Sequence, residues 1–255
     1  HKQKRSSGIP DEEIIGIAVR TLGLNELAPF DPKKRIIEYL LKEDPKDQLA
    51  DLSLRKFTYD TASDSPAPGG GSVSAAVGAL GASLGSMVAN LSANKRGWDD
   101  RWEEISVAAE KGKQVYEDLL AMVDEDTRAF NRVMDAFGLP KDNPEQKEIR
   151  KKAIQEATLN AIEVPFHVMK VAAEAVDLLE KMADTGNPNS ASDVAVGALC
   201  IRTAVSGACL NIRINAVELK DSLLVKEILI KADQIEKEVI HRCGQIQNQV
   251  LLKIM

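Results

Sequence analysis

One aspartate lies on a helix face that otherwise carries only apolar or small residues. Steps of four and three residues through 105–137 select this face, which consists of Ile105, Ala109, Gly112, Tyr116, Leu119, Val123, Asp126, Phe130, Val133 and Phe137. A carboxylate that faces a helical core is costly unless it is paired, protonated or hydrogen-bonded. Asp126 is therefore a candidate acid–base residue, and a buried salt bridge or a cap on a neighbouring helix is the structural alternative. Asp124 and Asp118 lie off this face, and we expect them to be solvated.

A glycine-rich turn is the second feature that could bind a reactant. Gly69, Gly70, Gly71 and Ser72 follow a Ser-Pro-Ala-Pro stretch and begin a helix without charged residues. Because glycine has no side chain, an anionic or carbonyl-bearing ligand can approach the free N–H groups at such a helix start. We take these four residues as candidate substrate-binding residues. A tight loop with Ser72 as the helix N-cap is the alternative.

Four further polar residues are candidates for substrate binding. Lys95 ends the uncharged helix, where it can meet either a ligand carboxylate or the last helix carbonyls. Asp193, Asn211 and Asn215 share one face of a later helix that is rich in small residues. Buried amides at such positions usually belong to structural hydrogen-bond networks, so both interpretations stay open for each residue.

The sequence offers little for metal or redox chemistry. The chain has three histidines, none with a partner at metal-ligand spacing, and we therefore expect no metal. Cys200, Cys209 and Cys243 form no CxxC pair, which favours free thiols in a reducing, cytoplasmic compartment. The chain opens at His1, and its first thirty residues contain no apolar signal core. We expect a processed or trimmed chain.

Composition and periodicity predict an all-α fold. Hydrophobic residues make up 44% of the 255 residues, charged residues 28% and aromatic residues only 4%, which favours helices over an aromatic-rich β-structure. We predict a multi-helix up-and-down bundle with long core helices and a short helical N-terminal arm. Its expected domains are an arm or linker at 1–50 and a helical domain at 51–255. The predicted helices cover 11–22, 32–42, 51–61, 101–137, 145–160, 162–183, 190–217 and 221–252, besides the uncharged helix, and Pro165 is expected in a first turn.

Charge and hydropathy limit the partners of the chain. The net charge is −6, and no long basic run is present, so nucleic acid and anionic membrane are not expected. Residues 65–94 contain no charged side chain. Because glycine, alanine and serine line one face of this segment, we predict a helix buried among other helices rather than a membrane span.

Several motifs together resemble the formimidoyltetrahydrofolate cyclodeaminase family, from about residue 29 to the end of the chain. They are Pro66–Ser72, Val123–Asp126 with Ala129 and Phe130, Gly186 with Asn187, Ser192 with Asp193, and Asn211–Asn215. Residues 22–39 also look like the segment that joins the transferase and cyclodeaminase halves of the bifunctional enzyme. The chain is then expected to be the second half of a longer protein.

The resemblance implies the conversion of 5-formimidoyltetrahydrofolate to 5,10-methenyltetrahydrofolate and ammonia, in histidine degradation. The family's catalytic aspartate falls on Asp126 by motif match. Tetrahydrofolate is expected as the substrate carrier, without a metal. Expected partners are a second copy of the chain, or a higher oligomer, and a formimidoyltransferase domain or subunit. Two alternatives remain at this point: a methenyltetrahydrofolate cyclohydrolase, or a helical assembly module without catalysis.

Overall fold

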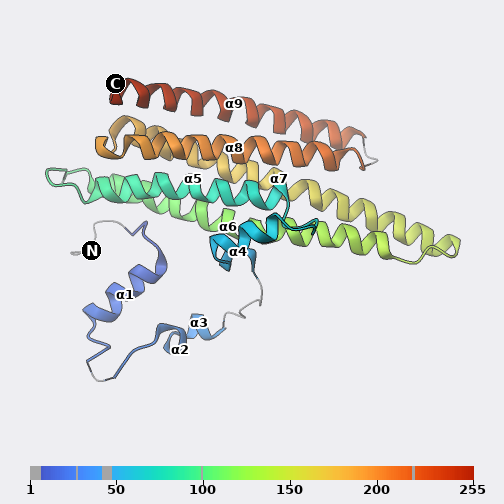
Figure 1. Cartoon of the computed structure of the whole chain (residues 1–255), viewed down its shortest axis with the longest axis horizontal. Coiled ribbons are helices and arrows are strands. Elements are labelled where there is room, and N and C mark those ends of the chain that lie inside the picture. Colours follow the sequence, from blue (N-terminus) through green and yellow to red (C-terminus); the bar gives the residue numbers. More distant parts are fainter. Residues whose placement is uncertain (1–6, 27, 42–47, 99, 220–221) are drawn as a thin grey trace.

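The structure, a computed structural model, is entirely helical apart from loops in the residues that it describes, 7–26, 28–41, 48–98, 100–219 and 222–255 (Figure 1). The long helices run alternately up and down. They are α5 (Gly70–Ala93), α6 (Trp102–Gly138), α7 (Pro144–Thr185), α8 (Ala191–Ala216) and α9 (Ser222–Ile254). The predicted all-α, up-and-down bundle is confirmed.

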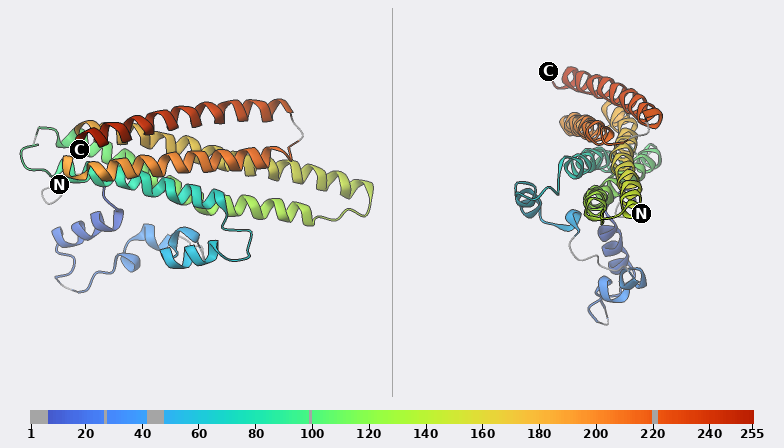
Figure 2. Two further views of the ribbon diagram at one scale, coloured as in Figure 1. Left: turned by 45° about the horizontal axis from the view of Figure 1, so that its top comes forward. Right: turned by 90° about the vertical axis from the view of Figure 1, so that its right-hand side faces the viewer.

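The hydrophobic core lies between α5, α6, α7 and α8, and α9 adds a row of buried residues to it. In this bundle α5 packs against α6 and α8, and α7 packs against the same two helices from the other side. Helix α9 covers α8 and α7 at the edge of the bundle (Figure 2). The hairpin of α6 and α7 extends beyond the start of α5 (Figure 1). The first turn of α5 therefore lies beside the second half of α6, where the Ser72 amide is bonded to Asp126.

Helix α5 buries its small residues and exposes part of its large apolar ones. Ala75, Ala82 and Ala89 have no exposed surface, because a face of alanine, glycine and serine lets neighbouring helices approach closely. On the other face Leu80 is 58% exposed and Leu91 is 47% exposed. The small face thus packs in the bundle as predicted, and the described residues leave much of the surface of Leu80 and Leu91 uncovered.

Helix α7 is continuous, whereas the sequence predicted two helices with Pro165 in the first turn of the second. Pro165 instead lies inside α7. A proline has no N–H, so the carbonyl four residues earlier loses its helical partner. In this structure Asn215 Nδ2 donates a hydrogen bond of 2.8 Å to that carbonyl, the oxygen of Ala161. A side chain from α8 thereby replaces the missing bond, which local sequence could not indicate.

The described part of the chain before α5 forms short elements: α1 (Asp11–Thr21), α2 (Pro32–Arg35), α3 (Ile37–Leu41), the 3₁₀ turn η1 (Leu49–Asp51) and α4 (Leu54–Thr61). The predicted arm, 1–50, contains α1 to α3 and the start of η1, and the boundary at residue 50 stays a prediction. The helix predicted at 32–42 is divided at Ile36, which has extended backbone angles. The Ile36 carbonyl accepts the amides of Tyr39 and Leu40 and so begins a new turn. Residue 42 lies outside the described residues.

Among the residues that the structure describes, two helical segments are long and apolar enough to cross a membrane by length and composition alone, α5 and Pro188–Ala216. Within the bundle, 61% of the apolar window of α5 and 44% of the second window are buried. Core helices of globular bundles pass the same test, so this finding is weak evidence for a span, and absence of a membrane partner stays a prediction.

Candidate functional site

The carboxylate of Asp126 lies against the first turn of α5. Its Oδ2 accepts a hydrogen bond of 2.9 Å from the Ser72 amide and one of 3.2 Å from the Ser72 hydroxyl. Ser72 Oγ also lies 2.8 Å from the Val123 carbonyl, so the one hydroxyl proton is shared between these two acceptors. In the part of the chain that the structure describes, no donor is hydrogen-bonded to Oδ1. Among the described residues, hydrogen bonds therefore hold only one of the two carboxylate oxygens in place.

Gly71 makes room for this carboxylate. A Cβ added at Gly71 would meet Asp126 Oδ1 well inside 3.0 Å, a distance that real Cβ atoms essentially never fall below. A Cβ at Gly70 would instead lie 3.4 Å from Asn211 Nδ2. The glycine turn thus admits a side chain of the protein itself. Binding of substrate by Gly69, Gly70, Gly71 and Ser72 stays a prediction.

Ser72 is not the N-cap of α5. Gly69 occupies that position, without a side-chain hydrogen bond. Asp126 satisfies the amide of the third helical residue instead, and an anion is favourable at a helix N-terminus. Asp126 thus caps a neighbouring helix, which is the structural alternative to a catalytic role. This arrangement also holds the carboxylate in one orientation, which a catalytic role requires.

Burial sets the direction of the Asp126 pKa. Removal of the carboxylate from water raises its pKa above the ordinary value of 3.8, and the two hydrogen bonds from Ser72 partly offset this by favouring the charged form. Acid–base catalysis is most effective when the pKa of the group approaches the working pH. The raised pKa therefore brings Asp126 closer to the range in which it can both accept and release a proton.

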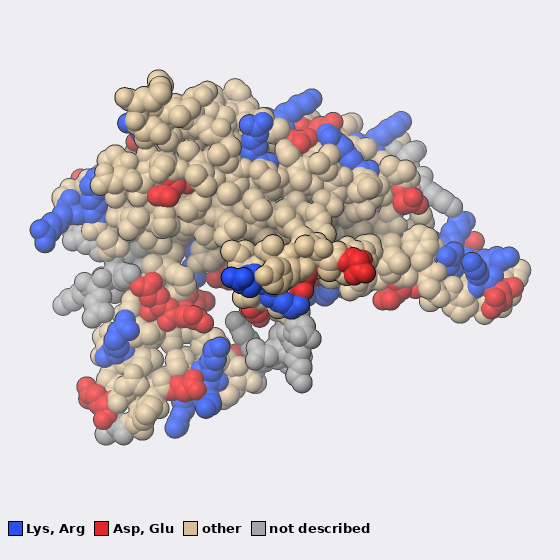
Figure 3. All heavy atoms as spheres, in the orientation of Figure 1, with Lys and Arg blue, Asp and Glu red and all other residues tan. Residues whose placement is uncertain are grey.

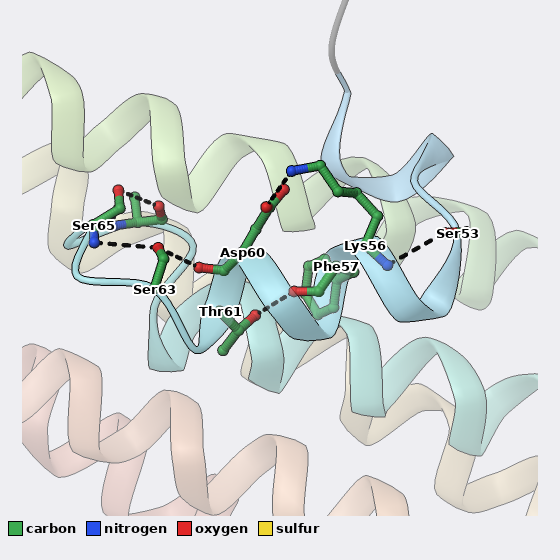
Figure 4. A network of polar contacts seen from close by, with 8 residues as sticks. Ser53, Lys56, Phe57, Asp60, Thr61, Ser63 and Ser65 are labelled. Carbon is green, nitrogen blue, oxygen red and sulfur yellow. Dashed lines mark hydrogen bonds and ion pairs between the residues drawn. The ribbon is translucent and has the colours of Figure 1, made fainter.

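A chain of hydrogen bonds fixes the loop that leads into the glycine turn (Figure 4). Ser53 caps α4 by accepting the Lys56 amide. After α4, Ser63 Oγ donates to the Asp60 carbonyl at 2.7 Å, and the Ser65 amide donates to Ser63 Oγ. Ser65 Oγ in turn donates to the Ala67 carbonyl at 2.7 Å. These short-range bonds hold the loop beside the start of α5.

Asp124 is buried, and our expectation that it is solvated is wrong. Its side chain is 9% exposed. Its Oδ1 accepts the Leu49 amide at 2.7 Å, and its Oδ2 accepts the Ala50 amide at 3.3 Å. The position is off the apolar face of α6, but the arm covers it through η1. Periodicity within α6 gave no signal for this contact, because the partner lies about 75 residues earlier in the chain.

The two asparagines of α8 lie at the same end of the bundle as Asp126. Asn211 Nδ2 donates to the Gly207 carbonyl at 2.9 Å and lies next to Gly70. Asn215 Nδ2 is bonded to α7, as described above. Both amide nitrogens thus take part in the fold, and a role of these residues in substrate binding stays a prediction.

Lys95 and Asp193 lie at the opposite end of the bundle. A rise of 1.5 Å per residue places Lys95 about 35 Å along α5 from Ser72. Asp193 is in the first turn of α8, near the end of α5 where the Asn187 amide donates to Ser92 Oγ at 2.8 Å. The Lys95 ammonium lies 4.3 Å from the centre of the Trp98 ring. A single subunit therefore does not bring either residue together with Asp126.

Among the described residues, one group of potential metal ligands has its ligand atoms close together: Cys209, Asp233 and Glu236. Arg213 forms ion pairs with both carboxylates, at 2.8 Å and 3.2 Å. The guanidinium already supplies the positive charge that a metal would bring. The group joins α8 to α9.

Sequence reasoning missed Thr127, which also lies at the site. Its Oγ1 is 3.2 Å from Ser72 Oγ, with either oxygen able to donate. Thr127 directly follows Asp126, but helical periodicity places it on a different part of the helix surface. Only the position of α5 shows that the Ser72 hydroxyl reaches both residues.

The fold and the site together define a helical-bundle protein in which a largely buried carboxylate, that of Asp126, is hydrogen-bonded to a glycine-rich helix start. Residues 53–234 match the family model described as formiminotransferase-cyclodeaminase. The chain belongs to the formiminotransferase-cyclodeaminase family. Residues 1–42 match the model of the formiminotransferase domain.

Several known proteins are similar to this chain. The formimidoyltransferase-cyclodeaminase of Mus musculus is 38% identical over 216 residues, which cover 84% of this chain and 40% of the relative. The Gallus gallus protein of the same name is 36% identical over 241 residues, covering 91% and 44%. The chain therefore spans less than half the length of these two relatives.

Two other matches cover most of the matched protein. The methenyltetrahydrofolate cyclohydrolase of Methylorubrum extorquens is 37% identical over 177 residues, which cover 69% of this chain and 85% of the relative. The crystal structure of formiminotetrahydrofolate cyclodeaminase from Thermotoga maritima superposes with a TM-score of 0.72 at 28% identity. That match covers 80% of this chain and 98% of the other.

Proposed function

We propose that the chain is a folate-dependent cyclodeaminase that converts 5-formimidoyltetrahydrofolate to 5,10-methenyltetrahydrofolate and ammonia. The family membership supports cyclodeamination of a folate. The observation that carries the role of Asp126 is its carboxylate geometry, with one oxygen held by Ser72 and the other unbonded within the described residues. A cytoplasmic location, a place in histidine catabolism and catalysis without a metal belong to the same proposal.

The reaction needs one proton to move between two nitrogens. N10 of the folate attacks the carbon of the protonated formimidoyl group, which gives a tetrahedral carbon bonded to N5, N10 and NH2. Asp126 accepts the N10 proton and then donates it to the departing NH2, which leaves as NH3. The positive charge of the substrate amidinium remains on the methenyl product, so atoms and charge balance. One carboxylate can serve as base and then as acid, because it ends the cycle in its starting form.

Methenyltetrahydrofolate cyclohydrolase is the second candidate activity. The Methylorubrum extorquens relative favours it, because the match covers 85% of that shorter protein. In this reaction water attacks the methenyl carbon, and Asp126 would remove a proton from the water. The two reactions differ in one product, since only the cyclodeaminase releases ammonia.

The experiment that tests the function follows ammonia release and methenyl absorbance together on 5-formimidoyltetrahydrofolate. We expect the two signals to rise in equal amounts. Hydrolysis of methenyltetrahydrofolate without ammonia release from the formimidoyl substrate would assign the cyclohydrolase instead. Absence of both reactions in the folded protein, together with no thermal stabilisation by reduced folate, would support an assembly module.

The hydroxyl of Ser72 is expected to affect the pH dependence of the reaction. Because its hydrogen bond favours the charged form of Asp126, Ser72→Ala raises the pKa of the carboxylate further. Activity falls as Asp126 becomes protonated, so the acid limb of the kcat/KM profile should move to higher pH. Ser83→Ala is the control, because that hydroxyl bonds to the Ala79 carbonyl within α5. An acid limb that stays in place in Ser72→Ala would show that another group controls it.

We also propose that the apolar face of α5 and α8 joins two copies of the chain. On α8, Leu210 is 62% exposed and Ile214 70%, and Val217, directly after this helix, is 80% exposed. Figure 3 shows a broad face with few charged side chains over these helices. Contiguous exposed apolar surface of this kind is typical of protein interfaces.

The interface can be tested by the mass of the protein in solution. We expect the chain to sediment as a dimer, and Ile214→Asp to weaken dimerisation by about tenfold or more, since it buries an unpaired charge. Leu252→Asp, at an 80% exposed position of α9, is the control. A parent chain that sediments as a monomer at high concentration would contradict the proposal.

A further inference from the structure

Ser7, Gly8 and Ile9, the residues before α1, are bound to the helical bundle by specific contacts. The Gly8 carbonyl accepts a hydrogen bond of 3.0 Å from Asn90 Nδ2 of α5. The Ser7 amide donates to Ser106 Oγ of α6 at 3.4 Å, and Ile9 is only 6% exposed. Polar and apolar contacts from two core helices therefore bind this short segment.

Only glycine fits at position 8, because the backbone there lies directly against α6. A Cβ at Gly8 would meet the backbone carbonyl carbon and oxygen of Ala109 well below the 3.0 Å limit for real contacts. The atoms that it would strike belong to the backbone of α6, which cannot move aside as a flexible side chain can. The φ of Gly8 does not lie in the left-handed region, so an alanine would be excluded by contact with α6 alone.

Charged groups extend the contact into α1 and further along the arm. Lys113 of α6 forms an ion pair with Asp11 in the first turn of α1. Val19 in the last part of α1 is 7% exposed. The second attachment is η1, whose Leu49 and Ala50 amides are bonded to Asp124. The arm is thus attached to α6 at two places, at Ser106–Lys113 and at Asp124.

The two parts in contact belong to different family models. The segment before α1 lies within residues 1–42, which match the formiminotransferase domain, whereas α5 and α6 lie within residues 53–234. We propose that the surface of α5 and α6 around Asn90 and Ala109 is a docking site for the end of the formiminotransferase domain. Docking at this surface fixes the formiminotransferase segment against the cyclodeaminase bundle, so that it is not a freely moving tether.

Amide hydrogen exchange on the whole chain tests this inference without depending on enzyme activity. Gly8→Ala should lower the protection of residues 9–21 by about tenfold or more, because overpacking against α6 forces the segment off the bundle. Asn90→Ala removes the side chain that donates to the Gly8 carbonyl, and it should also lower the protection of residues 9–21. Gly16→Ala is the matched control in α1, where an added Cβ would lie 3.7 Å from Arg20 Nη1 and meet nothing closer.

The pattern of exchange distinguishes the outcomes. Loss confined to residues 9–21 in Gly8→Ala and Asn90→Ala, with α7 unchanged and Gly16→Ala protected as in the parent, supports docking. Unchanged protection in both variants would overturn the proposal, because the segment would then not depend on its contacts with Asn90 and Ala109. Equal loss of protection over α5 to α8 would overturn it as well, since the segment would then be part of the core of the bundle.

Discussion

Asp126→Asn is expected to lower the turnover of 5-formimidoyltetrahydrofolate by about 10²- to 10⁴-fold, the range typical of losing one general acid–base group. Asparagine keeps the size of the side chain and can still accept a hydrogen bond from the Ser72 amide, but it cannot carry the proton from N10 to the departing nitrogen. Ammonia release and methenyl absorbance should fall together. Asp118→Asn on the same helix is the control, because Asp118 is bonded to Gln114 at 2.8 Å and lies off the apolar face.

The same substitution separates catalysis from stability. Burial raises the pKa of Asp126 above 3.8, so the fold favours the protonated form over the charged one. A group of this kind stabilises the fold fully below its ordinary pKa, and that contribution is lost as the pH rises through the higher pKa of the folded state. At neutral pH, Asp126→Asn should therefore unfold in urea at the same or a higher midpoint than the parent. A variant with low activity and a clearly lower midpoint would instead indicate that Asp126 mainly caps α5.

Asp126 could be identified from the sequence because the periodicity of a single helix, α6, is enough to place it on an apolar face. Its apolar neighbours repeat every three or four residues, and Ile105, Leu119 and Val123 are buried as this period predicts. One carboxylate within such a face needs a partner whatever the rest of the fold is. The family resemblance then supplied the proposed reaction, which periodicity alone could not do.

Other features depend on contacts between distant segments, and the sequence could not show them. The continuity of α7 through Pro165 relies on Asn215 from another helix. The burial of Asp124 relies on η1. Lys95 and Asp193 were grouped with Asp126 by residue type, although the length of α5 already separates Lys95 from Ser72 by about 35 Å. The predicted length of this helix was therefore a signal in the sequence that Lys95 and Ser72 lie at opposite ends of the bundle.

Gly71→Ala is expected to reduce turnover by at least about 100-fold while the bundle remains folded. The new methyl group would occupy the space of Asp126 Oδ1, so the carboxylate would have to rotate or α5 would have to shift. A displacement of about 1 Å from the reactive geometry is enough for a loss of this size. Gly244→Ala in α9 is the control, because an added Cβ there meets nothing within 4 Å.

A double-mutant cycle shows whether Gly71 acts through Asp126. If the glycine only makes room for the carboxylate, Gly71→Ala should add little to the loss already caused by Asp126→Asn, since both changes remove the same function. Losses that multiply would mean that Gly71 contributes separately, as the approach of a substrate to the bare backbone would require. The cycle therefore decides between two roles of the glycine turn: to make room for the Asp126 carboxylate, or to provide a binding surface for the folate.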